Sequence, residues 1–223
     1  MSLDLKNYKQ YLPKVIWGII ALLVVAFIFR VAIWEHNYYA DKEGSQRAVA
    51  ESNAPTNVDE TEPDSASYTV AADRPRYLSI EKLNIENARV IEVGINASGE
   101  LSTPNNIFDA GWYFASGKPG FGGTMLLDGH NGGPTKDGIF KHLDQLTVGD
   151  IIKIERGDGK IFNYSVIENA SVDLDEADAW MTRIQQSPES GKESLSIITC
   201  TGEWSQARNT YLSRQFLRAV LTE

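Results

Sequence analysis

Residues 151–166 read IIKIE, RGDGK and IFNYSV in succession. Two apolar runs, 151–155 and 161–166, flank a polar segment that contains an Asp-Gly pair. Such a pair favours the tight turn that joins two antiparallel strands. The stretch therefore predicts a β-hairpin, and with it a β-rich fold.

Short apolar runs of the same kind lie on both sides of this hairpin, separated by Gly, Pro, Asn and Asp. Helices are predicted where apolar residues recur at helical spacing, at 138–146 and 175–183. Many short strands are typical of a sandwich or barrel, so we expect residues 76–223 to form one all-β domain. The predicted strands are 77–80, 88–93, 123–128, 151–155, 161–168, 194–200 and 215–221.

The most apolar part of the chain lies near its start. Residues 15–34 contain a single charged side chain, that of Arg30. At a rise of about 1.5 Å per residue, a helix of this length spans about 30 Å, the thickness of the hydrocarbon core of a bilayer. The sequence therefore predicts a transmembrane helix at 15–34 after a short leader at 1–14.

The charges around this span bear on its orientation. Lys6, Lys9 and Lys14 precede it, and an acidic segment follows soon after it. This pattern favours a cytoplasmic N-terminus and an extracellular C-terminal part, although basic residues are nearly balanced across the span. A cleaved signal peptide is the alternative, but the apolar run is long and no small-residue cleavage site follows it. We expect a single-pass protein of the cell membrane with an uncleaved anchor.

Residues 35–75 lack apolar periodicity and are rich in Ala, Ser, Thr, Asn, Asp and Glu. A segment of this composition buries too little surface to offset the entropy lost on ordering. It predicts a flexible acidic linker between the membrane and the folded domain.

The composition of the whole chain excludes several classes of protein. Lys and Arg number 21 against 30 Asp and Glu, the net charge is −9, and there is one Cys. A disulfide-stapled fold and a zinc site built on several thiolates both require more cysteines. A globally basic nucleic-acid binder requires the opposite charge, so no nucleic-acid partner is expected.

The single cysteine, Cys200, lies at the end of a predicted strand and precedes the polar residues Thr-Gly-Glu. An extracellular lone thiol is either an inert core residue or a nucleophile presented at a strand end. A nucleophilic thiol requires a proton partner. His36 lies beside the predicted span and His142 in a predicted helix, whereas His130 follows a strand and precedes a loop. His130 is therefore the best candidate.

When a thiol attacks an acyl carbon, the carbonyl oxygen becomes an oxyanion. A guanidinium stabilises such an oxyanion well. Arg208, Arg214 and Arg218 all follow Cys200. Arg214 opens the last predicted strand and is the arginine expected nearest to a site built at strand ends. Arg208, in the preceding loop, is the second candidate.

Several motifs together resemble the sortase family, the membrane-anchored cysteine transpeptidases of bacterial surfaces. LDGH at 127–130 and LSIITC at 195–200 are followed by Arg214 at the start of the last strand. The second motif is similar to the Thr-Leu-x-Thr-Cys signature of the family, with Ser196 in the first Thr position. The resemblance covers about residues 76–223.

This resemblance implies an eight-stranded sortase-type β-barrel in which Cys200, His130 and Arg214 converge in a groove. Cys200 is implied as the nucleophile, His130 as the general acid and then base, and Arg214 as the clamp for the oxyanion and substrate. Thr199, Asn131 and the segment 169–193 are implied as substrate contacts. The family cleaves a Leu-Pro-x-Thr-Gly-like sorting signal through a thioacyl enzyme and passes the acyl group to an amine.

The implied partners are surface proteins with a C-terminal sorting signal and an amine acceptor, such as a cell-wall precursor or a pilin lysine, at a shared membrane. No cofactor is implied, and scattered acids do not reveal calcium dependence. The tripeptide 62–64 reads Glu-Pro-Asp and does not match the Asp-Pro-aromatic lid of pilus-polymerising sortases. The sequence also ends soon after the last predicted strand. Both features favour a lidless type with a single span.

Two other functions compete with this one. A non-catalytic binding module could keep the barrel and present peptides, but peptide binding alone requires neither a thiol nor a proton donor. An L,D-transpeptidase is also a β-rich cysteine enzyme, but that family places its Cys shortly after a Ser-His-Gly run. Here His130 and Cys200 are far apart in the sequence.

Overall fold

The computed structural model describes residue 30, residues 58–96, residue 99 and residues 101–222. The predicted leader 1–14, the predicted span 15–34 apart from Arg30, and residues 35–57 of the predicted linker lie outside these described residues. Within the described part, no helix is both long enough and apolar enough to cross a membrane. The membrane span and its orientation stay predictions.

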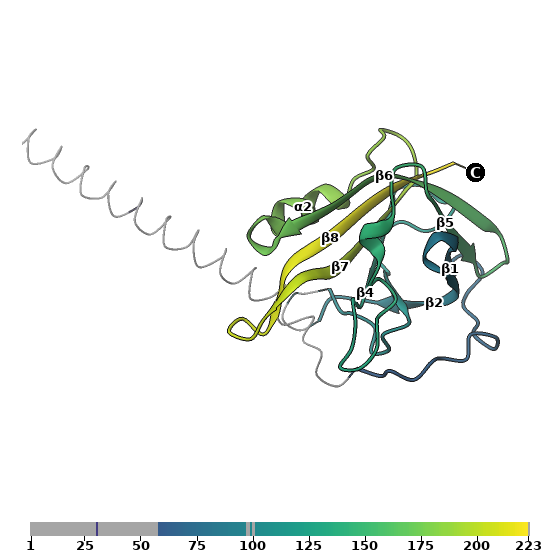
Figure 1. Ribbon diagram of the computed structural model, residues 1–223. Helices are drawn as coiled ribbons and strands as arrows, with labels where there is room; N and C mark the ends of the chain where they lie inside the picture. Colours follow the sequence, from purple (N-terminus) through teal and green to yellow (C-terminus); the bar gives the residue numbers. More distant parts are fainter. Residues whose placement is uncertain (1–29, 31–57, 97–98, 100, 223) are drawn as a thin grey trace, which may run out of the picture. The chain divides into compact units, whose positions relative to one another are not determined.

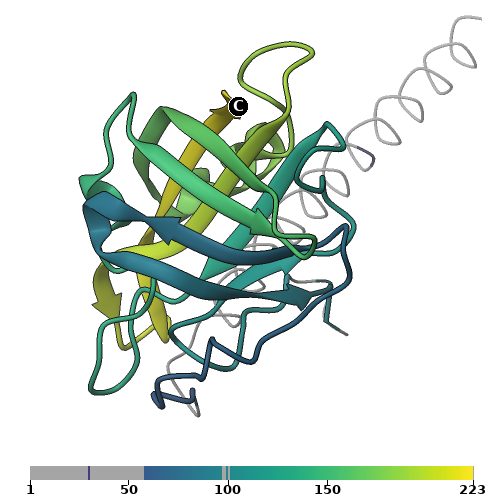
Figure 2. The same ribbon diagram turned by 90° about the vertical axis from the view of Figure 1, so that its right-hand side faces the viewer.

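Eight strands close into a barrel in the order β1-β2-β3-β4-β7-β8-β6-β5 (Figures 1 and 2). Neighbouring strands are antiparallel except for β2 with β3 and β4 with β7, which are parallel. The predicted eight-stranded all-β barrel is therefore confirmed. The strands are β1 (Pro75–Ile80), β2 (Ile85–Val93), β3 (Ala110–Tyr113), β4 (Thr124–Gly129), β5 (Ile151–Arg156), β6 (Ile161–Asp173), β7 (Ser194–Ser205) and β8 (Thr210–Leu221).

The predicted hairpin forms from β5 and β6, which pair antiparallel from Ile151 with Ser165 to Glu155 with Ile161. The N–H of Arg156 donates to the carbonyl of Lys160 at 2.8 Å and closes the turn. Gly159 in this turn has a φ of +83°. This backbone conformation is strained for residues that carry a side chain.

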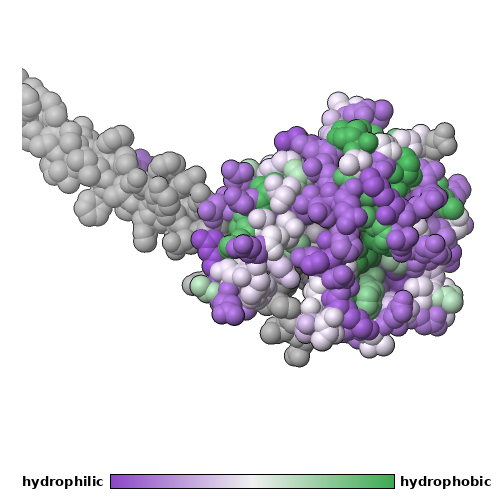
Figure 3. Space-filling model, in the orientation of Figure 1, coloured by the Kyte–Doolittle hydropathy of each residue, from purple (hydrophilic) through white to green (hydrophobic). Residues whose placement is uncertain are grey.

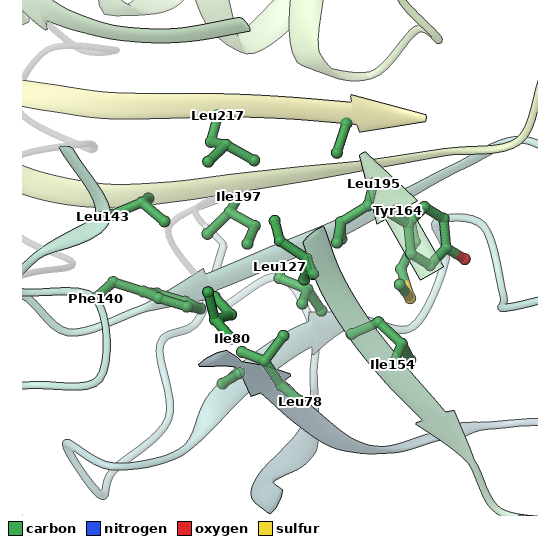
Figure 4. Packing of buried hydrophobic residues seen from close by; sticks show 14 of the residues in the cluster. Leu78, Ile80, Leu127, Phe140, Leu143, Ile154, Tyr164, Leu195, Ile197 and Leu217 are labelled. Atoms are coloured by element: carbon green, nitrogen blue, oxygen red, sulfur yellow. The ribbon is translucent and has the colours of Figure 1, made fainter. Parts of the chain in front are cut away.

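The barrel interior is filled by alternate residues of each strand, because side chains of a strand point to opposite faces in turn. Leu127 of β4, Leu195 and Ile197 of β7 and Leu217 of β8 point inward (Figure 4). Burial of each such side chain stabilises the folded state by roughly 1.5–3 kcal/mol. The intervening residues of β4, β7 and β8 consequently face the outside of the barrel.

A second apolar cluster, the outer cluster, covers this outward face of β4, β7 and β8. The short helix α2 (Ala177–Ile184) packs on it, and the Trp180 ring stacks on Phe216 with centroids 5.5 Å apart. Elsewhere the face drawn in Figure 3 is largely hydrophilic, with hydrophobic side chains in separate patches. The buried members of the outer cluster are Leu126, Val172, Ala177, Ile184, Ile198 and Phe216.

The prediction of a helix at 138–146 is wrong for most of that stretch. Only the 3-10 turn η2 (Leu143–Gln145) forms there. The N–H of Ile139 donates to Ile107 and that of Phe140 to His130, so these groups bond to other segments. The helix predicted at 175–183 is confirmed in its second part, since α2 follows the 3-10 turn η3 (Leu174–Glu176). A further 3-10 turn, η1 (Glu81–Leu83), joins β1 to β2.

The last two strands are longer than predicted. The β7 strand continues past Cys200 to Ser205, and β8 begins at Thr210, so Arg214 lies inside the strand and does not open it. The rings of Trp204 and Tyr211, 5.2 Å apart, pack across this extension. Strand β3 has no counterpart among the strands predicted from apolar runs.

The end of the predicted flexible linker packs on the barrel. Asp59 forms a parallel bridge with Asn106, and the hydroxyl of Tyr68 donates to the carbonyl of Val90 at 2.7 Å. The side-chain amide of Asn106 donates to the carbonyl of Thr61 at 2.7 Å. Composition averaged over the segment hides these specific contacts, which fix residues from 58 onwards on the domain.

Candidate active site

Cys200 and Arg214 lie side by side on two neighbouring strands. In the antiparallel register of β7 and β8, Cys200 is the direct partner of Arg214. Paired residues turn their side chains to the same face of the sheet. Ile198 and Phe216, two residues away on each strand, belong to the outer cluster. The thiol and the guanidinium therefore face the outside of the barrel, next to that cluster.

His130 comes directly after β4, on the other side of β7. These two strands are parallel, with Asp128 paired to Ile198. Continuing the register by two residues brings His130 level with Cys200. The hydroxyl of Thr199 donates to the carbonyl of Gly129 at 2.8 Å, so the two chains stay together up to this point. Three adjacent segments thus bring together the three predicted residues.

The backbone around His130 packs tightly against the segment that follows it. The N–H of Phe140 donates to the carbonyl of His130 at 3.0 Å, and that of Gly138 donates to Asn131 at 2.9 Å. A Cβ on Gly138 would lie 2.4 Å from the His130 carbonyl oxygen. Position 138 therefore requires glycine, and the contact fixes the backbone that carries the imidazole.

The imidazole of His130 is held in one tautomer. Its Nε2 lies 2.7 Å from the carbonyl oxygen of Pro104. A carbonyl oxygen only accepts, so Nε2 carries the proton and Nδ1 holds the lone pair of the neutral ring. Burial lowers the pKa of His130, and the bond to Pro104 partly opposes this change. The ring is therefore neutral at pH 7 and has a nitrogen that accepts a proton.

The thiol of Cys200 is 5% exposed. Burial raises its pKa to about 11; the positive charge of Arg214 lowers the pKa, and the carboxyl of Asp128 raises it. The thiol is consequently protonated at neutral pH. Because the thiolate is the reactive form, nucleophilic attack requires transfer of this proton to a nearby base.

The guanidinium of Arg214 is buried, with 1% of the residue exposed. Its Nη1 donates to the carbonyls of Tyr211 and Ser213 at 2.9 and 3.0 Å, and Nη2 donates to the hydroxyl of Thr210 at 3.2 Å. These bonds hold the positive charge beside the thiol.

Arg208 lies in the turn between β7 and β8. Its side chain is 56% exposed, and its nearest acidic partner is Asp175 at 3.9 Å. Of the two candidate arginines, Arg214 is therefore the one beside Cys200, whereas Arg208 faces solvent.

The predicted substrate contacts have different environments. Thr199 is buried, and its hydroxyl bonds the Gly129 carbonyl, so it joins β4 to β7. Asn131 is also buried, directly after His130. The segment 169–193 includes α2, which covers the outer cluster next to Cys200. Contact of any of these residues with a substrate stays a prediction.

Sequence reasoning assigned no role to Asp128, which stands two residues before His130. The residue is 7% exposed, and one carboxylate oxygen accepts a 3.0 Å hydrogen bond from the hydroxyl of Thr103. Burial raises the pKa of Asp128 to about 7. The signal in the sequence was an acidic residue inside an otherwise apolar predicted strand.

Among the residues that the structure describes, no three His, Cys, Asp or Glu side chains are grouped so as to hold a metal ion. The roles of a cofactor and of calcium stay at the level of prediction.

Comparison with known proteins identifies one family. Residues 78–222 match the family model of the Sortase domain. A search of curated proteins gave no match. Sortase C of Streptococcus pneumoniae has a similar fold, with 18% identity over 82% of this chain and 89% of that chain, and a TM-score of 0.51.

Two further solved structures are similar to the chain. Sortase C2 of pilus island 1 of Group B Streptococcus has 15% identity, covers 84% of this chain and 98% of that chain, and has a TM-score of 0.50. A Clostridium perfringens sortase D5 transpeptidase has 23% identity, with 66% and 77% covered and a TM-score of 0.44.

Proposed function

Because the chain belongs to the sortase family of transpeptidases, we propose that it cleaves a Leu-Pro-x-Thr-Gly-like sorting signal through a thioacyl intermediate on Cys200. The acyl group then passes to an amine acceptor at the cell surface. The observation that carries this proposal is the register of three strands. It pairs Cys200 with Arg214 and brings His130, directly after β4, level with Cys200.

The chemistry follows from the protonation states of these groups. The thiol gives its proton to Nδ1 of His130, and the sulfur attacks the carbonyl carbon that follows the Thr side chain of the signal. Arg214 stabilises the resulting oxyanion. The C–N bond then breaks, and the imidazolium returns its proton to the departing amine of Gly. A thioester on Cys200 and a neutral His130 remain.

The second half of the reaction repeats these roles. The acceptor amine loses a proton to His130 and attacks the thioester carbon, and the sulfur leaves as the thiol of Cys200 once that proton returns. A thioester keeps the energy of the peptide bond only if an amine arrives before water does. Anchoring the enzyme, the signal and the acceptor at one membrane raises their effective concentrations. We therefore include a membrane anchor at 15–34 and an extracellular domain in the proposal, with a cell-wall precursor or a pilin lysine as acceptor.

The test uses the full-length chain in detergent, a Leu-Pro-Ala-Thr-Gly peptide and triglycine. We expect a peptide–triglycine product, and a mass increase on Cys200 equal to the acyl fragment when triglycine is omitted. Cys200→Ala is expected to abolish both and to leave the melting temperature close to that of the wild type. Turnover retained in Cys200→Ala would contradict the mechanism. Binding of the peptide without product or adduct would favour the non-catalytic binding module.

A further inference from the structure

Asp128 is a buried acid on the same face as the proposed nucleophile. In β4, Leu126 belongs to the outer cluster, and Asp128, two residues later, turns to the same side. Across β7, Asp128 pairs with Ile198, the residue of that face adjacent to Cys200. Its charge reaches the thiol, because the Asp128 carboxyl contributes to the raised pKa of Cys200. Asp128 thus lies in the row of this face that directly precedes Cys200.

The two oxygens of this carboxyl differ. Oδ2 accepts the hydrogen bond from the hydroxyl of Thr103, and the segment 103–104 covers this edge of the site, where Pro104 also holds His130. Oδ1 is buried and has no hydrogen-bond partner among the residues that the structure describes. A buried carboxylate oxygen without a partner is destabilising, and such a group in a native protein often has a catalytic or binding role.

The position of Oδ1 indicates which part of a ligand would complete it, given the proposed function on which this step rests. A sorting signal that places its scissile carbonyl at Cys200 and extends back towards α2 must pass over the row of this face that directly precedes Cys200. That row contains Asp128 of β4 and Ile198 of β7. The residue directly before the scissile bond therefore lies above Oδ1.

We propose that Asp128 is a specificity-determining residue that accepts, through Oδ1, a hydrogen bond from the side-chain hydroxyl of the residue immediately before the scissile bond. This acceptor therefore selects Thr or Ser at that position and disfavours an apolar side chain of equal size. A site built to bond a hydroxyl leaves its own polar group unpaired when the hydroxyl is missing, which gives strong discrimination.

A neutral hydroxyl suits this carboxyl better than the ammonium of the acceptor amine. An ammonium would have to lose its hydration in a position where 7% of the residue is exposed. The acceptor is also expected to reach the thioester from the side that the departing Gly has vacated. Binding of the amine by Asp128 is therefore the competing outcome of the test.

The experiment compares two peptides that differ by the hydroxyl alone, Leu-Pro-Ala-Thr-Gly and Leu-Pro-Ala-Val-Gly, because Thr and Val have nearly the same shape. For each, kcat/KM of acylation is measured from release of the C-terminal fragment. The wild type is expected to prefer the Thr peptide by on the order of 10²-fold or more. Asp128→Val is expected to reduce this preference at least about tenfold, mainly by slowing acylation by the Thr peptide. Asp128→Asn keeps an oxygen acceptor and is expected to retain a clear preference.

The matched control is Asp144→Val, which removes an exposed carboxylate in η2 and is expected to leave the preference unchanged.

Equal losses with both peptides in Asp128→Val and Asp128→Asn, at unchanged preference, would assign Asp128 a structural role and overturn the inference. Unchanged acylation with a raised KM for triglycine would assign it to the acceptor and overturn the inference as well. Absence of an acyl adduct on the wild type would overturn the proposed function and this inference together. If Asp128→Val does not fold, Asp128→Ala replaces it as the variant without an oxygen acceptor, and the same reduction in preference is expected.

Discussion

Cys200 and Arg214 are direct register partners across β7 and β8. The pairing holds the thiol and the guanidinium on one face, and the hydrogen bonds from Arg214 to the backbone of Tyr211 and Ser213 keep the arginine in place. The positive charge lowers the pKa of the neighbouring thiol, against the larger effect of burial. One strand pair therefore supplies both the proposed nucleophile and the proposed electrostatic stabiliser.

The arginine assignment leads to the first prediction. Arg214→Ala is expected to lower kcat/KM of acylation by on the order of 10²–10³-fold, because it removes the guanidinium that is proposed to stabilise the oxyanion. Arg214→Lys keeps the charge but not the planar fork, so an intermediate loss is expected. Arg208→Ala is the control, and less than about a twofold change is expected for this exposed side chain. Peptide cleavage by folded protein, with folding checked by circular dichroism, measures all three. Activity kept in Arg214→Ala and lost in Arg208→Ala would transfer the role to Arg208.

The second prediction concerns the thiol itself. Alkylation by iodoacetamide proceeds through the thiolate, so its rate follows the thiolate fraction. With the pKa of Cys200 raised to about 11, the rate constant is expected to rise about tenfold per pH unit from pH 7 to about pH 10. At a fixed pH, Arg214→Gln is expected to react more slowly and Asp128→Asn faster, because these side chains lower and raise that pKa. A rate that levels off below pH 9 would contradict the raised pKa of the thiol.

The sequence predicted those features that depend on local pattern. The hairpin of β5 and β6 followed from two apolar runs and an Asp-Gly turn, and each of the seven predicted strands overlaps an observed strand. Cys200, His130 and Arg214 each lie at one end of an apolar run, and this local pattern marks them as candidates. The structure has the three on adjacent segments of the barrel.

Other features depend on contacts between distant segments, and local pattern does not reveal these. The helix predicted at 138–146 is largely absent because the N–H groups of Ile139 and Phe140 bond to Ile107 and His130. The ordered segment after residue 58 depends on bonds to the loop around residue 106. Local pattern does not distinguish Asp128, because its environment arises only when β4, β7 and the loop at Thr103 come together.

The buried acid gives the third prediction, on stability. An unfolded Asp titrates near pH 3.9, whereas burial raises the folded pKa of Asp128 to about 7. The folded state thus holds the proton more tightly, so this residue makes the protein less stable as pH rises from about 4 to about 7, with no further change above. Asn does not titrate. Asp128→Asn is therefore expected to raise the melting temperature by several degrees at pH 8 and by less at pH 4.5.

Thermal unfolding of both proteins across this pH range measures the difference directly. His130 titrates in the opposite direction, because its pKa is lowered by burial, but it is present in both proteins and cancels in the comparison. An Asn variant whose advantage is the same at pH 4.5 and pH 8 would show that the Asp128 carboxyl is not raised in pKa by the fold.

The fourth prediction concerns Glu60, which ties the segment before β1 to the loop after His130. Its carboxylate accepts hydrogen bonds from the N–H groups of Thr135 and Lys136 at 2.8 and 3.1 Å, and the Lys136 ammonium donates to the Glu60 carbonyl at 3.0 Å. Glu60→Ala removes the side-chain acceptor of both amides. The amides of Thr135 and Lys136 are therefore expected to exchange with solvent hydrogen several-fold faster than in the wild type, as followed by mass spectrometry.

Glu62 supplies the matched control, since it is an exposed acid of the same segment. Glu62→Ala is expected to leave exchange at 135–136 unchanged. Because the loop begins at Asn131, directly after the proposed base, Glu60→Ala is also expected to lower the rate of acylation more than the affinity for the peptide. Faster exchange in both variants would mean that net charge, and not the Glu60 contact, controls the loop. Unchanged exchange in Glu60→Ala would show that the loop is held by its own backbone bonds, such as that from the N–H of Gly133 to the carbonyl of Lys136 at 2.9 Å.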